Sequence, residues 1–564
     1  MKKTIPLVII VFSVLFSCNK KETSIQLSEN STQKKWVDSI YNQMTLKEKV
    51  GQLFMIAAYS NKDQKHTDSI QKLIKENGIG GLVFFQGGPV RQAKQTNLYQ
   101  SVSKVPLLIA MDAEWGLNMR LDSTARFPYN MTLGAVKDND LIRRVGEKIG
   151  EHCNRLGVHI NFAPVVDINT NSKNPIIGVR SFAEDKYNVT NKALAFTKGL
   201  QSQNVLACAK HFPGHGDTDK DSHKTLPTVL LSKARIDSVE MYPYKQLFKN
   251  NMAGVMVAHL NVPSLEKEAG VPSSLSHHIV SDLLKEKLGF KGLVFTDALN
   301  MKGAANYKET GAIDLAAFMA GNDILVLTED ASKGISKIME AYQKKELTEE
   351  RLAHSVKKIL TAKFDVQLHN FKPIKTQNLI SDLNDETNNI LNEEVFINAI
   401  TAIKNENNTL PLKKDKNKKI AFLGLGDGSS SAFLKELKLH LNIDEVSNLP
   451  HKDLLNKLKK YDQVIIGYHR LNSRKTVKIS NADKAIIEAI ALNNNVILDV
   501  FASQYSLENL SFKNLNASII SYENSEIAQK ISAQVLIGNK EANGKLPASM
   551  NQEFKAGHGI KILE

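Results

Sequence analysis

The chain has 564 residues, of which 42% are hydrophobic and 23% are charged. This composition excludes a disordered or fibrous protein, and the length is too great for one ordinary core, so two or three globular domains are expected. The formal net charge is +14, but the lysines are scattered and form no basic motif interleaved with aromatic residues, so no nucleic-acid partner is expected. An acidic polymer, anionic lipid or a merely solvated surface fits the charge better.

The N-terminus has the features of a signal peptide over residues 1–17. Two lysines precede an apolar run over residues 5–16 that is too short for a stable membrane anchor. The Leu-Phe-Ser-Cys sequence ending at Cys18 resembles the lipobox of bacterial lipoproteins, which implies cleavage before Cys18 and lipidation of that cysteine. The polar stretch 18–33 predicts a flexible tether. We therefore expect an exported lipoprotein on the periplasmic side of the envelope, anchored in the outer membrane; a plain N-terminal anchor is the alternative.

The region from 34 to 368 alternates short apolar runs with longer amphipathic stretches. The apolar runs cover residues 51–57, 78–85, 105–112, 157–167, 205–212, 254–260, 292–299 and 323–328. Continuous rather than alternating apolar runs are typical of strands covered on both faces. Eight strand–helix units predict a (β/α)8 TIM barrel in the α/β class, with a doubly wound open sheet as the alternative.

One amphipathic stretch shows the helical pattern clearly. Its apolar residues recur at helical spacing, at Ile142, Val145, Ile149, Cys153 and Leu156. Cys153 and Cys208 are the two cysteines after Cys18, and both lie in apolar surroundings. Two buried free thiols are expected, although an oxidising compartment would permit a bridge.

Polar residues end several of the expected strands. They are Asp112, Asp167, Lys210, His211, His259 and Asp297. The mouth where barrel strands end carries the active site in this fold, and a charge there needs a partner or a ligand. Asp167 is expected to be structural, while His259 fits either a supporting role or a hydrogen-bonded place in the core.

A second α/β domain is expected over residues 391–564, after a polar linker at 369–390. Its strands are predicted at 418–426, 463–469, 495–503 and 517–522. We expect it to form a sandwich of helices on a sheet that supports the barrel or adds a wall to its mouth.

The stretch KHFPGHGDTDKDSH, residues 210–223, concentrates polar chemistry. A metal site is one interpretation, but proline and glycine between His211 and His215 make a helix with paired ligands improbable. The spacing of a phosphate-binding loop is absent. Acid/base chemistry is the third interpretation, since Asp221 stands two residues from His223 and a carboxylate can orient an imidazole. Ser222 as a nucleophile lacks the expected strand–turn–helix context.

The same stretch closely resembles the signature of family 3 glycoside hydrolases, in particular their β-N-acetylglucosaminidase branch. Further pieces resemble family segments in order along the chain: MDAEWGLNMR, NPIIGVRSF, FTDALNM, KNENNTLPL and GKLPASM. The resemblance spans nearly all of the chain after the tether. It departs at Trp115, where the branch often has a glycine, which bears on the sugar or aglycone preference.

The resemblance implies a role for each matching residue. Asp297 would be the nucleophile, and His223 the general acid/base, tuned by Asp221. The residues implied to bind the terminal sugar are Asp112, Arg120, Arg180, Lys210 and His211. Arg180 has a competing structural interpretation as the partner of Glu184 or Asp185. The implied reaction needs no metal and no cofactor.

The expected function is therefore retaining removal of terminal β-GlcNAc from cell-wall fragments or related oligosaccharides. Such chemistry needs a nucleophile and an acid/base on opposite faces of the anomeric carbon. Histidine titrates near neutrality, and its neutral form repels an anionic acceptor less than a carboxylate does, so phosphorolysis stays open. A β-glucosidase or β-xylosidase of the same family and a non-catalytic sugar-binding lipoprotein are the competing hypotheses.

Overall fold

Eight parallel strands form the first sheet of the computed structural model, which describes residues 31–221, 224–415, 417–447 and 449–562. The expected lipidation residue Cys18 and acid/base His223 lie outside the described residues. The strands are β1 (Phe54–Ala58), β2 (Gly81–Phe84), β3 (Leu108–Met111), β4 (Ile160–Asn161), β5 (Leu206–Phe212), β6 (Gly254–Val257), β7 (Leu293–Thr296) and β8 (Leu325–Val326).

The sheet curls into a barrel. β1 pairs with both β2 and β8, and the remaining strands follow one another in sequence order up to β7. A parallel bridge between Phe295 and Ile324, with the Thr296 amide donating to the Ile324 carbonyl at 3.0 Å, links β7 to β8. This closure confirms the predicted barrel and excludes the open doubly wound sheet.

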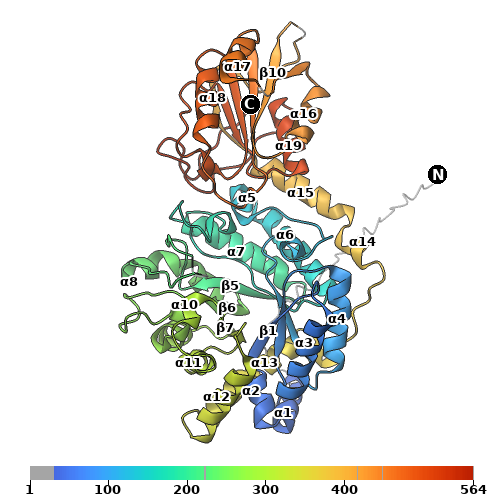
Figure 1. Cartoon of the computed structure of the whole chain (residues 1–564), viewed down its shortest axis with the longest axis vertical. Coiled ribbons are helices and arrows are strands. Elements are labelled where there is room, and N and C mark those ends of the chain that lie inside the picture. The colour runs from blue at the N-terminus through green and yellow to red at the C-terminus, as the bar shows by residue number, and fades with distance from the viewer. Residues whose placement is uncertain (1–30, 222–223, 416, 448, 563–564) are drawn as a thin grey trace, which may run out of the picture.

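Helices cover the outside of the barrel strands (Figure 1). They are α1 (Ser31–Gln43), α2 (Leu46–Gly51), α3 (Gln64–Asn77), α4 (Pro89–Ser101), α5 (Asn130–Ala135), α6 (Asn139–Arg155), α7 (Lys186–Gln201), α8 (Lys233–Arg235), α9 (Tyr242–Phe248), α10 (Lys302–Ala305), α11 (Ala312–Ala320), α12 (Ala331–Gln343) and α13 (Glu349–Asp365), with a π-helix at His278–Lys287 after β6. Side-chain caps begin several of them, such as Asp63 before α3 and Asp185 before α7. The apolar face predicted at residues 142–156 is buried in α6, and Cys153 and Cys208 are buried free thiols as expected.

The second domain holds a six-stranded sheet in the order β11-β10-β12-β13-β14-β9. Its strands are β9 (Thr401–Asn405), β10 (Ile420–Gly426), β11 (Ile443–Glu445), β12 (Gln463–His469), β13 (Val496–Phe501) and β14 (Ala517–Ile520). Its helices are α15 (Glu386–Ala399), α16 (Ser431–Lys438), α17 (His451–Leu458), α18 (Asn481–Ala491) and α19 (Glu526–Leu536). β9 runs antiparallel to β14 and the other pairs are parallel, so the sheet is mixed. The two edge strands, β9 and β11, were not predicted.

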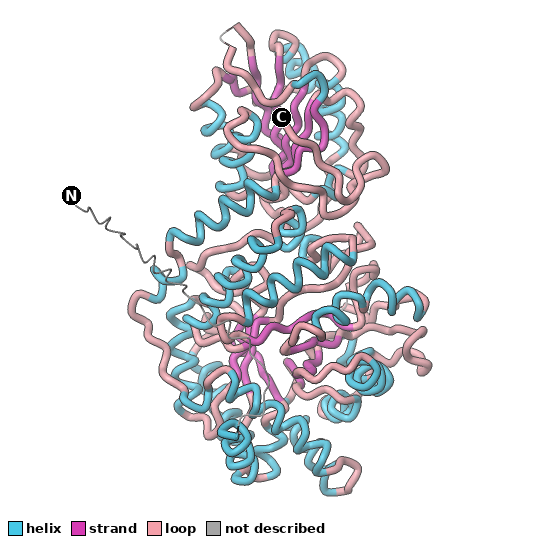
Figure 2. The backbone as a smooth tube through the Cα atoms, turned by 180° about the vertical axis from the view of Figure 1, so that it is seen from behind, coloured by secondary structure: helices cyan, strands magenta, loops and turns pink. Residues whose placement is uncertain are grey.

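The chain between the two sheets folds into short helical segments. The expected linker, residues 369–390, contains α14 (Leu379–Leu383) and the first residues of α15. The second domain then stacks on the side of the barrel that carries α5, α6 and α7 (Figures 1 and 2).

A buried carboxylate joins the two domains through an ion pair and two hydrogen bonds. Glu523 of the second domain is 1% exposed and forms an ion pair with Arg126. Its other oxygen accepts hydrogen bonds from the Tyr129 amide at 2.8 Å and the Thr132 hydroxyl at 2.6 Å. The Ser549 hydroxyl and amide donate to Glu184 in a second contact between the domains, the amide at 2.9 Å. Among the described residues, no helix is both long and apolar enough to cross a membrane.

Candidate active site

Polar side chains from several strand ends converge on one cavity of about 370 Å³ at the mouth of the barrel. Asp112 follows β3, Lys210 and His211 lie in β5, and Asp297 follows β7. Together with Arg120 and Arg180, all of them line the cavity. The structure therefore brings together the five expected sugar-binding residues and the expected nucleophile.

Two carboxylates and three cations form the charged part of the cavity wall. Lys210 Nζ lies 2.7 Å from Asp112 Oδ1 and 2.9 Å from Glu114 Oε1. Arg120 pairs with the other oxygen of Asp112, and Arg180 Nη2 lies 2.7 Å from Glu114 Oε1. Lys210 is 2% exposed and Glu114 is fully buried. Their charges are therefore stabilised by their ion pairs and not by hydration.

The network fixes the charge state of its members. Burial alone would raise the pKa of Asp112, but the charges of Lys210 and Arg120 outweigh burial and hold it well below its usual value. Burial likewise opposes the Arg180 and Lys210 charges at Glu114, whose pKa falls to about 2. Burial would lower the pKa of Lys210, but Asp112 and Glu114 raise it. At neutral pH the wall therefore presents ionised donors and acceptors to a polyhydroxylated ligand.

Hydrogen bonds from the neighbouring strand hold the backbone at Ala113, between Asp112 and Glu114. Asn161 of β4 accepts a hydrogen bond from the Ala113 amide and donates to the Ala113 carbonyl, both at 3.0 Å. In extended backbone, residues two apart point to the same side, so Asp112 and Glu114 both face the cavity.

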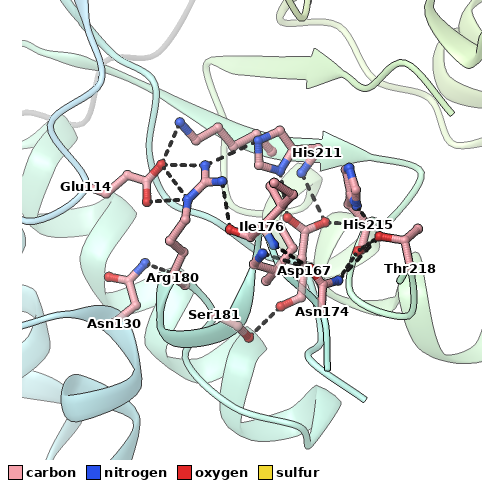
Figure 3. A network of polar contacts seen from close by, with 12 residues as sticks. Glu114, Asn130, Asp167, Asn174, Ile176, Arg180, Ser181, His211, His215 and Thr218 are labelled. Atoms are coloured by element: carbon pink, nitrogen blue, oxygen red, sulfur yellow. Dashed lines mark hydrogen bonds and ion pairs between the residues drawn. The ribbon is translucent and has the colours of Figure 1, made fainter. Parts of the chain in front are cut away.

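A second network lies behind His211 (Figure 3). The His211 Nδ1 group donates to Asp167 at 2.7 Å, and the other oxygen of Asp167 accepts the His215 amide at 2.7 Å. Burial would raise the pKa of Asp167, but the contacts with His211 and His215 lower it. Asp167 thus has a structural role, as expected: it orients the His211 ring. The Nε2 atom of that ring lies on the cavity side, 3.5 Å from Arg180 Nη2.

Asp297 is half-buried at the carboxyl end of β7. Its Oδ1 accepts the Ala298 amide at 2.8 Å, and its own amide donates to the Val257 carbonyl at 2.9 Å. His259 is buried, with Nε2 2.9 Å from the Ala298 carbonyl and Nδ1 2.7 Å from the Ser274 hydroxyl. His259 therefore supports the turn that carries Asp297 and does not line the cavity.

The loop after β5 turns sharply before the expected acid/base dyad. Gly214 has φ +132°, a region that L residues rarely adopt, and a Cβ at Gly216 would lie 1.9 Å from the Ile168 carbonyl oxygen. The Asp221 carbonyl accepts the amides of Lys224 and Thr225, both at 3.0 Å. Asp221 is half-buried, and its partner in the expected dyad lies outside the described residues.

The structure corrects the competing interpretation of Arg180 and gives the place of Trp115. Arg180 pairs with Glu114, not with Glu184 or Asp185, because Glu184 binds Ser549 and Asp185 caps α7. Trp115 does not line the cavity; it is 6% exposed and packs edge-on against Tyr129 with ring centroids 5.0 Å apart.

Sequence reasoning missed two charged residues of the cavity. Glu114 could have been found from its i, i+2 relation to Asp112, which places both carboxylates on one side of an extended strand end. Arg474 comes from the second domain and also lines the cavity, and no local pattern marks it.

The contribution of the buried Glu114 ion pairs to stability should depend on pH. Its folded pKa, about 2, lies below the ordinary value of 4.5, so its contribution to stability is complete above pH 4.5 and is lost as pH falls toward 2. We expect Glu114→Gln to lower the free energy of unfolding by on the order of 3 kcal/mol at pH 7, and the deficit to shrink as pH approaches 2. Urea unfolding at pH 7 and pH 3 measures this, with exposed Glu286→Gln as the matched control. A deficit independent of pH would contradict the assignment.

A closed (β/α)8 barrel with an ionised cluster and an aspartate at its carboxyl mouth has the architecture of an enzyme active site. Comparison with known proteins specifies the family. Residues 45–362 match the glycosyl hydrolase family 3 N-terminal domain, and residues 400–558 match the family's C-terminal domain. The chain belongs to glycosyl hydrolase family 3 and is a glycoside hydrolase.

Relatives with known names match most of the chain. The chain is 30% identical over 455 residues to β-hexosaminidase A of Pseudoalteromonas piscicida, covering 73% of this chain and 75% of the relative. It is 28% identical over 403 residues to a β-N-acetylglucosaminidase/β-glucosidase of Cellulomonas fimi, covering 70% and 71% of the two chains. A solved family 3 β-N-acetylglucosaminidase of Paenibacillus sp. str. FPU-7 superposes with a TM-score of 0.75 at 29% identity, over 90% of this chain and 99% of the other.

Proposed function

We propose that the protein is a retaining exo-β-N-acetylglucosaminidase that removes terminal β-GlcNAc from cell-wall fragments or related oligosaccharides. The observation that carries the proposal is one cavity in which Asp297 accompanies the ionised cluster around Lys210. A volume of about 370 Å³ suits one sugar residue better than a run of them. The names of the relatives support the acetylated sugar.

The chemistry assigns one role to each group. The Asp297 carboxylate attacks the anomeric carbon while the His223 imidazolium gives its proton to the departing oxygen, forming a glycosyl–Asp297 ester. The neutral His223 then takes a proton from water, whose oxygen attacks the anomeric carbon and frees Asp297. Asp221 orients the imidazole and stabilises its charged form. Asp112, Arg120, Arg180, Lys210 and His211 bind the hydroxyl groups of the terminal sugar.

Choice of sugar tests the proposal directly. We expect the purified protein to release nitrophenol from 4-nitrophenyl β-GlcNAc with kcat/KM at least about tenfold above that for the β-glucoside, because a site that binds a polar group discriminates against its absence. A preference for the glucoside would overturn the choice of sugar but leave the family intact. Turnover of neither would favour the sugar-binding lipoprotein.

The identity of the product distinguishes hydrolysis from phosphorolysis. We expect free GlcNAc as the product with and without added inorganic phosphate. A sugar phosphate as the main product would identify a phosphorylase instead.

We further propose that the chain is exported and anchored through lipid on Cys18, on the periplasmic side of the envelope. The lipobox-like sequence supports this placement. Incorporation of a labelled fatty acid that persists in Cys18→Ala would contradict it.

A further inference from the structure

A second cavity of about 590 Å³ lies between the two domains. The barrel loop 172–178 forms one wall and the second-domain loop 472–478 forms the other. Three residues line both this interdomain groove and the active-site cavity: Ile176, Arg180 and Arg474. The groove therefore adjoins the place where the terminal sugar is proposed to bind.

The two loops lie next to each other at Gly178 and Thr476. Gly178 adopts φ +44°, and a Cβ there would lie 3.6 Å from the Thr476 hydroxyl of the second domain. The groove thus needs both domains, and its barrel wall ends at Arg180, the partner of Glu114.

Positive charge dominates the groove. Lys478 is neutralised by Glu508 at 3.2 Å, and Arg180 by Glu114. Three further cations line it: Lys173, Arg474 and Lys475. Within the described ranges, the structure records no ion pair or side-chain hydrogen bond for the charged groups of these three. The groove therefore holds an excess of cations that a bound anion would compensate.

Arg474 is held in place by an aromatic support. Its guanidinium carbon lies 5.1 Å from the centroid of the Trp115 ring, and Trp115 packs on Tyr129. Tyr129 in turn lies under Arg126, with 4.2 Å between guanidinium carbon and ring centroid. Arg474 is exposed to solvent and lies against one aromatic ring without an ion pair among the described residues, as expected of a binding group rather than a structural pair.

We propose that the interdomain groove is an anion-binding subsite for the leaving-group side of the substrate, in which Arg474 and Lys475 bind a carboxylate. The inference rests on the proposed function, since it takes the terminal sugar to bind beside Asp297. Two sources could supply the anion: a carboxylate carried by the leaving sugar, or free phosphate. The groove is far larger than a phosphate ion, which favours the sugar-borne carboxylate.

Paired disaccharides test the proposal. One carries β-GlcNAc on GlcNAc; the other is identical except for a lactyl ether carboxylate on the leaving sugar. We expect the wild-type protein to favour the carboxylated disaccharide by about tenfold in kcat/KM, the size of one charged hydrogen bond. Arg474→Ala with Lys475→Ala should bring the ratio of the two kcat/KM values close to one, and added salt should reduce it in the wild type.

The controls separate the subsite from general damage. Lys460→Ala makes the same change in the second domain at a residue that lines neither cavity, and should leave the ratio unchanged. Arg474→Lys keeps the charge and should retain part of the preference. Melting temperatures of the variants check folding, and the ratio itself cancels any uniform loss of activity.

Each outcome decides something. A wild-type ratio near one without any acceleration by inorganic phosphate, or a preference that survives the double substitution, overturns the subsite. Acceleration by inorganic phosphate that is lost in the double variant, without discrimination between the disaccharides, supports the anion site and assigns it to the acceptor. Failure to cleave the aryl β-GlcNAc at all would instead count against the proposed function.

Discussion

Replacing Asp297 with asparagine is expected to lower kcat for 4-nitrophenyl β-GlcNAc by on the order of 10⁴-fold or more, the scale seen when an enzyme loses its covalent nucleophile. The amide cannot form the glycosyl ester, yet it has nearly the size of the carboxylate and can still accept the Ala298 amide. The fold should therefore survive. The measurement is steady-state kinetics beside a thermal melt, with Asp282→Asn as the matched control, because its side chain is 46% exposed and lies outside the cavity.

A second variant makes the result specific. His223→Ala removes the proposed proton donor, which nitrophenolate hardly needs because it is a good leaving group. We expect His223→Ala to lose less of the rate of glycosyl–enzyme formation with the aryl substrate than with the disaccharide. Asp297→Asn should lose the rate with both substrates to the same extent. Substantial aryl turnover by Asp297→Asn would show that another group is the nucleophile.

Removing the Glu523 carboxylate is expected to be the most destabilising single change at the domain interface. Glu523→Ala would leave the Arg126 guanidinium, the Tyr129 amide and the Thr132 hydroxyl without their shared acceptor. Breaking a buried pair by removing one partner costs about 3–5 kcal/mol. Because the Arg126 side chain is 29% exposed, we expect the lower end of that range, about 3 kcal/mol. Calorimetry should show a lower melting temperature and a separation of the two domain transitions.

The matched control lies in the helix that follows. Glu526 also pairs with a cation, Lys530 at 2.8 Å, but its side chain is 71% exposed. Glu526→Ala should change stability by less than about 0.5 kcal/mol, as exposed pairs contribute little. Equal effects at Glu523 and Glu526 would mean that the interface pair does not hold the domains together.

The Glu523 contact also connects stability to the proposed specificity. Arg126 supports Tyr129, Tyr129 supports Trp115, and Trp115 lies against Arg474. Docking of the second domain thus determines where the Arg474 cation lies relative to the active-site cavity.

The sequence by itself determined the barrel and most of its mouth. Eight continuous apolar runs are a local property, since strands covered on both faces must be apolar throughout, and the charged residues that end them stand out against that background. Asp112, Lys210, His211 and Asp297 were predictable for this reason, and so was the buried face of α6. The edge strands β9 and β11 were not, because β9 has two half-buried polar residues and β11 has only three residues.

Only the tertiary structure decided which charges meet. Lys210 stands 98 residues from Asp112, and the parallel barrel sets them 2.7 Å apart. Arg180 had nearby acidic residues in the sequence, yet it pairs with Glu114, 66 residues away. Arg474 reaches the cavity only because the second domain docks there. Strand and helix patterns follow from each segment's own side chains, whereas an ion pair depends on distance in space, and that distance is set by packing.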